Sequence, residues 1–144
     1  MICFKNKQAT IEYRASEQAI FCSWQGEVPS EQFQQVMKLK LQHMQALLPR
    51  NWMLDLRYME AIGYADQQWL LENWMQEFQK LPIRKIAIIQ SFDIYNSMVI
   101  EDFLRYSPVT GSCEVQLFAD QKTSLAWIKD LTHSSFLMGT GTYD

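Results

Sequence analysis

Cysteine, histidine and proline are scarce in this sequence, and glycine is little more common. The 144 residues include three Cys and two His, with four Pro and five Gly. The odd number of widely spaced Cys argues against a disulfide framework and fits a reducing compartment. Neither His43 nor His133 has a Cys, an acidic residue or a second His at metal-ligand spacing, so the sequence predicts no metal site.

Positive charge is not clustered, and long apolar runs are missing. The formal net charge is -3, from 13 basic and 16 acidic residues, and the chain contains no basic run. This pattern lacks the electrostatic footprint of a nucleic-acid-binding protein and disfavours an anionic membrane surface. No segment approaches the roughly 18 to 20 apolar residues of a membrane span, and residues 1–6 lack the pattern of a secretory signal. We therefore expect a cytoplasmic protein with no nucleic-acid partner and no membrane insertion.

Sequence patterns that carry catalytic chemistry are also absent. The chain has no Gly-x-Ser-x-Gly turn, no glycine-rich phosphate-binding pattern and no loop with the dense acids of an EF-hand. We therefore expect a protein that is not an enzyme, with no catalytic residue and no cofactor. If the protein were an enzyme, Asp55 and Asp66 near a strand end would be the acids to mutate first.

The sequence does contain enough apolar residues for one core. Hydrophobic residues make up 48% and aromatic residues 13% of the chain, and no linker or shift in composition divides them. A chain of this size can bury a full core without disulfides or metal. We expect a single domain over residues 1–132, followed by a flexible tail at residues 133–144 that has no sustained period.

The expected strands fall into two groups. The first quarter of the chain contains three short strands with antiparallel connections, at residues 2–5, 9–14 and 19–24. Beyond Gly26 the period changes, and the remaining strands alternate with helices, at residues 52–57, 83–90 and 113–118. Such alternation predicts parallel strands joined by right-handed crossovers.

Helical stripes separate the later strands. The first begins at Phe33 and ends before Pro49, and Ser30 is its expected cap. Three further helices each follow an aspartate for which N-capping is expected, namely Asp66, Asp93 and Asp120. On the second helix, Trp69 and Trp74 are five positions apart, which is about 140° around an α-helix. We therefore expect one of the two rings to reach a groove or a partner surface.

Side-chain alternation predicts how the helices are arranged. On the strand at 52–57, Leu54 and Leu56 point to one face, and Asp55 and Arg57 to the other. One face of the sheet is therefore expected to be drier than the other. The pattern predicts an α/β fold in which N-terminal antiparallel strands lead into a one-sided β/α superhelix with a mainly parallel central sheet.

The order and spacing of several short motifs indicate a family. These motifs are Trp24-Gln25-Gly26, Leu54-Asp55-Leu56-Arg57, Asp66-Gln67-Gln68-Trp69, Arg84-Lys85-Ile86-Ala87-Ile88, Phe118-Ala119-Asp120 and Ala126-Trp127-Ile128. Through them the chain resembles the STAS-like (SpoIIAA-like) superfamily, and especially its small stand-alone bacterial proteins. The resemblance implies an α/β domain that contacts protein partners or small ligands, often as a dimer, and that is usually not an enzyme.

The sequence departs from this resemblance at a regulatory position. In the anti-sigma factor antagonists of the superfamily, an Asp-Ser pair follows the strand, and a partner kinase phosphorylates the Ser. Here residues 54–75 contain no Ser or Thr. A phosphoserine switch of that type is not expected, and Tyr64, the remaining hydroxyl in the loop, is more typical of a packing or rim residue.

Candidate binding residues gather where the strand at 52–57 ends. Asp55 and Arg57 share a face, and they could form an ion pair, close a loop or position a ligand. The residues expected to bind a ligand or a partner are Asp55, Arg57, Tyr58, Tyr64, Trp69 and Gln90.

Two functions remain open from the sequence. The first is a regulatory or interaction module that acts through an unknown protein partner, including self-association as a homodimer across the less covered sheet face. The alternative is a carrier or sensor of a small apolar or amphipathic ligand, with an opening at Tyr58, Tyr64, Trp69 and Gln90.

Overall fold

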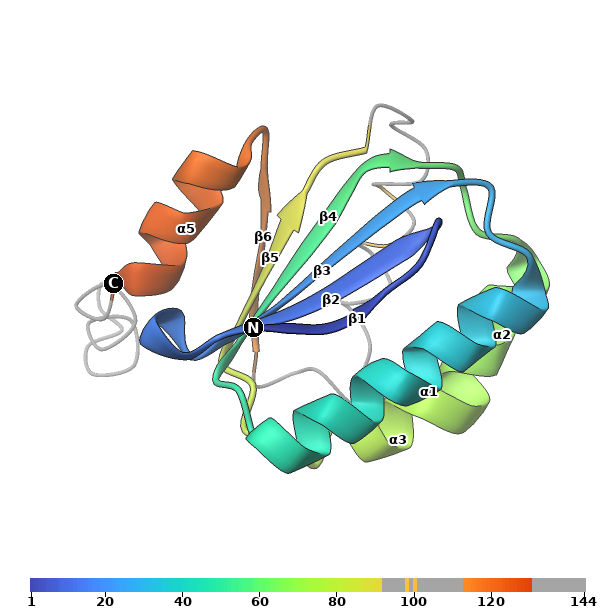
Figure 1. Ribbon diagram of the computed structural model, residues 1–144, viewed down its shortest axis with the longest axis horizontal. Helices are drawn as coiled ribbons and strands as arrows, with labels where there is room; N and C mark the ends of the chain where they lie inside the picture. Colours follow the sequence, from blue (N-terminus) through green and yellow to red (C-terminus); the bar gives the residue numbers. More distant parts are fainter. Residues whose placement is uncertain (92–97, 99, 101–112, 131–144) are drawn as a thin grey trace.

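The computed structural model describes residues 1–91, 98, 100 and 113–130, and a six-stranded sheet lies at its centre (Figure 1). The strands lie side by side in chain order: β1 (Ile2–Lys5), β2 (Ala9–Arg14), β3 (Ala19–Gly26), β4 (Asn51–Met59), β5 (Lys85–Ile89) and β6 (Glu114–Phe118). β1 and β3 both pair antiparallel with β2, whereas β3, β4, β5 and β6 are parallel. The predicted antiparallel start and mainly parallel remainder are confirmed.

Helical segments connect the strands. α1 (Ser30–Leu47) joins β3 to β4. The connection from β4 to β5 has three parts: α2 (Tyr64–Trp69), the π-helical segment η2 (Leu70–Trp74) and α3 (Met75–Phe78). A short turn, η1 (Ala15–Glu17), joins β2 to β3, and α5 (Gln121–Lys129) follows β6. The helix expected after Asp93 and the tail at residues 133–144 lie outside the described residues.

The two faces of the sheet carry unequal cores. Figure 1 places α1, α2 and α3 on one face and α5 on the other. The first face has the larger core, with apolar side chains from β2 to β6, so the predicted drier face is confirmed. The smaller core on the second face joins Phe21, Met53, Ala87 and Ile89 to Ile128 of α5. α5 departs from the expected one-sided stacking because β5 is apolar on both of its sides, and a strand of that kind needs cover on both faces.

Lys85 fixes α5 on the second face. Its side chain is buried, and Nζ donates hydrogen bonds to the carbonyl oxygens of Trp127 at 2.7 Å and Asp130 at 2.8 Å. The ammonium also lies 5.0 Å from the centroid of the Trp127 ring. These carbonyls belong to the carboxyl end of α5, where the helix dipole favours a positive charge. A lysine on the interior strand β5 therefore caps the carboxyl end of α5.

The structure confirms one of the predicted caps and corrects two. Asp120 is the N-cap of α5, where its side chain accepts a hydrogen bond from the backbone of Thr123. Ser30 is instead the first residue of α1, because the amide of Phe33 donates to the carbonyl of Pro29. α2 begins at Tyr64, so Asp66 lies inside its first turn and is buried, and its Oδ1 has no hydrogen-bond partner among the described residues.

The π-helical segment changes the geometry of the two tryptophans. The amide of Met75 bonds to the carbonyl of Leu70, five residues earlier, so residues five apart come close to one full turn. Trp74 is buried and its Nε1 donates to the carbonyl of Met37 at 2.8 Å. Trp69 is half-buried and packs edge-on against Phe33, with ring centroids 6.4 Å apart. Both rings therefore face the larger core, and the expectation that one reaches outward is wrong.

Candidate functional site

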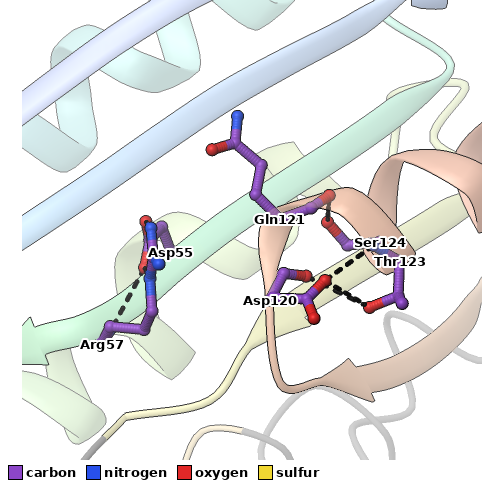
Figure 2. Close-up of polar contacts among 6 residues, drawn as sticks. All are labelled: Asp55, Arg57, Asp120, Gln121, Thr123 and Ser124. Carbon is purple, nitrogen blue, oxygen red and sulfur yellow. Dashed lines mark hydrogen bonds and ion pairs between the residues drawn. The ribbon is translucent and has the colours of Figure 1, made fainter.

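Asp55 and Arg57 form a two-point ion pair on the second face of the sheet (Figure 2). Asp55 Oδ1 accepts hydrogen bonds from the Arg57 amide at 3.1 Å and from Nε at 3.0 Å, and Oδ2 accepts one from Nη2 at 2.8 Å. The Asp55 side chain is 10% exposed and that of Arg57 is 28% exposed. The hydrogen bond with Asp55 raises the pKa of Arg57, so its charge is permanent. Asp55 therefore holds the guanidinium in one orientation.

An irregularity in β4 lies between Asp55 and Tyr58. Ser23 of β3 pairs with Asp55, but Gln25 pairs with Tyr58, so β4 contains one extra residue between these two pairs. A bulge of this kind redirects the side chains beyond it. Met59 consequently returns to the larger core, while Tyr58 is 57% exposed and the Arg57 guanidinium lies 5.5 Å from its ring. Simple alternation along the strand does not predict this arrangement.

The beginning of α5 lies within electrostatic reach of this pair. Asp120 Oδ1 accepts from the Thr123 amide at 2.8 Å and from Thr123 Oγ1 at 2.9 Å, as Figure 2 shows. These hydrogen bonds lower the pKa of Asp120, and its negative charge contributes to the raised pKa of Arg57. Asp120 is exposed and already committed to capping, so its local role is structural.

The other candidate residues are divided between the two faces. Gln90 is exposed just after β5, where its backbone N–H donates to the carbonyl of Phe118 at 2.9 Å. Tyr64 begins α2 and is 75% exposed, whereas Trp69 at the other end of α2 packs against the larger core. The structure thus brings Asp55, Arg57 and Tyr58 together, and it places Trp69 on the opposite face of the sheet.

Sequence reasoning missed a buried lysine in the larger core. Lys40 is 1% exposed and lies on the apolar stripe of α1, three residues after Met37 and four before Met44. This spacing was the available signal, because residues three and four positions apart lie on the same face of a helix. Its side chain borders a cavity of about 40 Å³ between the sheet, α1 and the α2–η2 connection. The cavity wall consists of Trp24, Phe33, Met37, Lys40, Trp52, Leu54, Leu56, Met59, Ile62, Gln67, Leu70, Trp74, Met75 and Ile100.

Two tryptophan rings flank the Lys40 ammonium. Nζ lies 4.7 Å from the ring centroid of Trp52 and 5.6 Å from that of Trp24. Lys40 Nζ and Trp52 Nε1 are both buried, and the Cys22 sulfur is the side-chain acceptor beside the two of them. Burial lowers the pKa of Lys40, and the neighbouring Cys22 acts in the opposite direction. Burial raises the pKa of the Cys22 thiol.

Metal-ligand clusters and membrane-spanning helices do not occur in the part of the chain that the structure describes. Residues 1–91 and 113–130 contain no group of three or more His, Cys, Asp or Glu side chains that could hold a metal ion. No helix among the described residues has the length and apolar character needed to cross a bilayer.

Comparison with known proteins gives a similarity of fold. No protein-family model matches the sequence, and no curated protein matches it. Among solved structures, the chain is similar to the crystal structure of an uncharacterized protein from the DUF3478 family with a SpoIIAA-like fold, from Shewanella loihica PV-4. The two chains are 15% identical with a TM-score of 0.59, over 87% of this chain and 98% of the other. The chain therefore has a SpoIIAA-like fold, in agreement with the order of its motifs.

Proposed function

We propose that this domain is a non-catalytic interaction module that contacts another protein beside the carboxyl end of β4. The observation that carries the proposal is the exposure of Tyr58, at 57%, next to an Arg57 that Asp55 holds in place. Tyrosine and arginine are, with tryptophan, the residue types enriched at the energetic centres of protein interfaces. An arginine that is already oriented loses little conformational freedom when it binds.

Tyr64 supports the same proposed site of protein contact. It is the most exposed aromatic residue among those described, at 75%, and it follows the loop that leaves β4. An exposed tyrosine offers apolar area and a hydroxyl group at a low entropic cost. The absence of Ser and Thr from residues 54–75 means that such binding would proceed without a phosphoserine switch in this segment.

Comparative affinity capture from the source organism tests the proposal. The double variant Tyr58→Ser/Tyr64→Ser removes both exposed rings, and Ile2→Ser is the matched control because Ile2 is 56% exposed on the distant edge strand β1. We expect a set of proteins that wild type and Ile2→Ser retain and the double variant loses. Equal recovery by all three proteins would count against the proposal. Light scattering across a concentration series distinguishes a second copy of the chain from a different partner.

The alternative function, a carrier of a small apolar or amphipathic ligand, would use the core cavity. Its volume of about 40 Å³ is far below the several hundred Å³ of a typical drug-sized ligand site. The cavity wall contains none of the four residues expected around an opening, which are Tyr58, Tyr64, Trp69 and Gln90. The exposed side chains beside the carboxyl end of β4 therefore support protein contacts better than the cavity supports transport of a lipid-like molecule.

A further inference from the structure

We propose that the protein which contacts the carboxyl end of β4 presents a basic segment, rich in arginine or lysine. The inference rests on the proposed function, because it names the chemistry of the partner at that same surface. Exposed tyrosine rings and exposed carboxylates on two neighbouring loops carry it. An aromatic face and a carboxylate both attract a guanidinium or ammonium group.

The loops that leave β3 and β4 lie side by side at this end of the sheet. In the parallel register Gln25 pairs with Tyr58, and Gly26 pairs with Met59. The Glu60 amide then donates a hydrogen bond to the Gly26 carbonyl at 3.0 Å. Figure 1 shows both loops passing along the same side of the molecule to the starts of α1 and α2. The residues that follow Gly26 and Met59 therefore belong to one surface.

The carboxylates of this surface outnumber the basic groups around them. Glu27 and Glu31 follow β3, Glu60 follows β4, and all three are exposed. Within residues 1–91 and 113–130, none of the three is part of an ion pair. Residues 26–37 and 58–79 contain no lysine or arginine, and the charge of Arg57 is matched by Asp55. The carboxylates are therefore available to a partner.

One lysine lies on the neighbouring turn between β1 and β2. The carbonyl of Lys7 accepts a hydrogen bond from Gln25 Nε2 at 2.8 Å, which places the turn on the far side of β3 from Glu60. A single lysine offsets only one of the three carboxylates, so the surface as a whole remains negative.

The tyrosine rings lie beside the carboxylates along the chain. Tyr58 is 57% exposed and comes two residues before Glu60, and Tyr64 is 75% exposed and comes four residues after it. The Arg57 guanidinium lies 5.5 Å from the Tyr58 ring, so this ring already has a cation near it within the chain. An arginine or lysine of the partner would meet both aromatic and acidic groups here.

Charge argues against a second copy of the chain as the partner at this surface. A symmetric dimer places the same patch of each copy against the other, so the acidic loops would face one another. Like charges brought together in an interface disfavour the complex. A nucleic acid is repelled for the same reason, since its phosphates are negative.

Fluorescence anisotropy with labelled octa-arginine tests the proposal, and labelled octa-glutamate is the control peptide. We expect the wild-type protein to bind octa-arginine and not octa-glutamate. Glu27→Gln/Glu60→Gln should weaken binding by about fivefold, because each exposed charge pair contributes modestly. Tyr58→Ser/Tyr64→Ser should weaken it to a similar extent.

Glu72→Gln/Glu77→Gln is the matched control for charge. It removes the same two negative charges from η2 and α3, farther along the connection to β5, and should keep the affinity within about twofold. Equal weakening in the two double variants would overturn the proposal, because the peptide would then respond to net charge alone. Absence of octa-arginine binding to the wild-type protein would overturn it as well.

Affinity capture separates this proposal from the proposed function. Proteins whose capture depends on Tyr58 and Tyr64 should also be lost in Glu27→Gln/Glu60→Gln and retained in Glu72→Gln/Glu77→Gln. Capture that depends on the tyrosines but not on Glu27 and Glu60 would overturn the basic partner and leave the protein contact standing. Capture that does not depend on the tyrosines would count against the contact itself.

Discussion

Lys85 Nζ donates a 2.7 Å hydrogen bond to the carbonyl oxygen of Trp127, so a side chain on the interior strand β5 is joined to the carboxyl end of α5. A second bond to the Asp130 carbonyl completes the contact. Charge, burial and hydrogen bonding act together here, on the face of the sheet that has the smaller core. The attachment of α5 should therefore depend on Lys85.

Lys85→Met is expected to destabilise the protein by about 2 kcal/mol, because hydrogen bonds to charged groups are worth roughly 1.5–3 kcal/mol. Urea unfolding measures the loss, and amide exchange along α5 should accelerate more than exchange in α1. Lys129→Met is the control, since the Lys129 side chain is 60% exposed and its ion pair with the less exposed Glu17 is long, at 3.7 Å. That control should cost less than about 1 kcal/mol. Equal losses for the two variants would contradict the capping role of Lys85.

The Asp55–Arg57 pair should respond asymmetrically to mutation. Arg57→Met leaves a buried carboxylate without its guanidinium partner, whereas Asp55→Asn leaves an arginine that remains partly solvated. We expect a loss in unfolding free energy of about 1–3 kcal/mol for Arg57→Met and a smaller loss for Asp55→Asn. The double variant should cost less than the sum of the two, because the partners interact directly. Additive losses in a double-mutant cycle would argue against the ion pair.

The buried Lys40 should give the stability a pH dependence of known sign. The folded protein releases the Lys40 proton at a lower pH than the unfolded chain, whose lysine has the ordinary pKa of 10.5. The unfolded state therefore binds more protons between these two values, and the free energy of unfolding rises with pH in that interval. Lys40→Met should lack this rise and be more stable below the interval, by on the order of 1 kcal/mol.

Denaturant unfolding of wild type and Lys40→Met across the alkaline range measures this difference. The contribution of other lysines, including Lys85, cancels when the two proteins are compared at each pH. Parallel stability curves for the two proteins would show that Lys40 is not buried in the folded state.

The π-helical segment should be necessary for the packing of Trp69. Deleting Leu71, which is 42% exposed, would remove the extra residue of this turn and rotate Trp69 by about 100° relative to Trp74. We expect Trp69 to leave its contact with Phe33 and the protein to lose about 2–3 kcal/mol, as for removal of a large apolar group from a core. Unfolding and tryptophan fluorescence measure both effects. Leu71→Ala retains chain length and should have little effect, and a deletion that is equally harmless would refute this view.

Local patterns in the sequence predicted much of the fold. The six strands, the helix before Pro49 and the Asp120 cap each depend on neighbouring residues, and all three are confirmed. The Asp66 cap was wrong because α2 begins earlier, at Tyr64, where no capping side chain marks the start. The position of α5 could not be predicted in this way. Ala87 and Ile89 form an apolar surface on the second face of the sheet only together with side chains of neighbouring strands, and α5 covers that surface.

The candidate site was less accessible to sequence reasoning. The proximity of Asp55 and Arg57 follows from a strand period of two, and the structure shows them paired. The exposure of Tyr58 depends on a bulge in β4, and no residue in that strand indicates the bulge in the sequence. Lys40 was overlooked because a charged side chain is normally expected at the surface, although its spacing from Met37 and Met44 places it in the core.

Photo-cross-linking in intact cells tests the central claim, that the carboxyl end of β4 contacts another protein chain. A photoreactive phenylalanine would replace Tyr58, and the same residue at Ile2 provides an equally exposed control on the opposite part of the sheet. We predict a discrete cross-linked product from position 58, to a different protein or to a second copy, and none from position 2. No product at position 58, or the same products at both positions, would contradict the account.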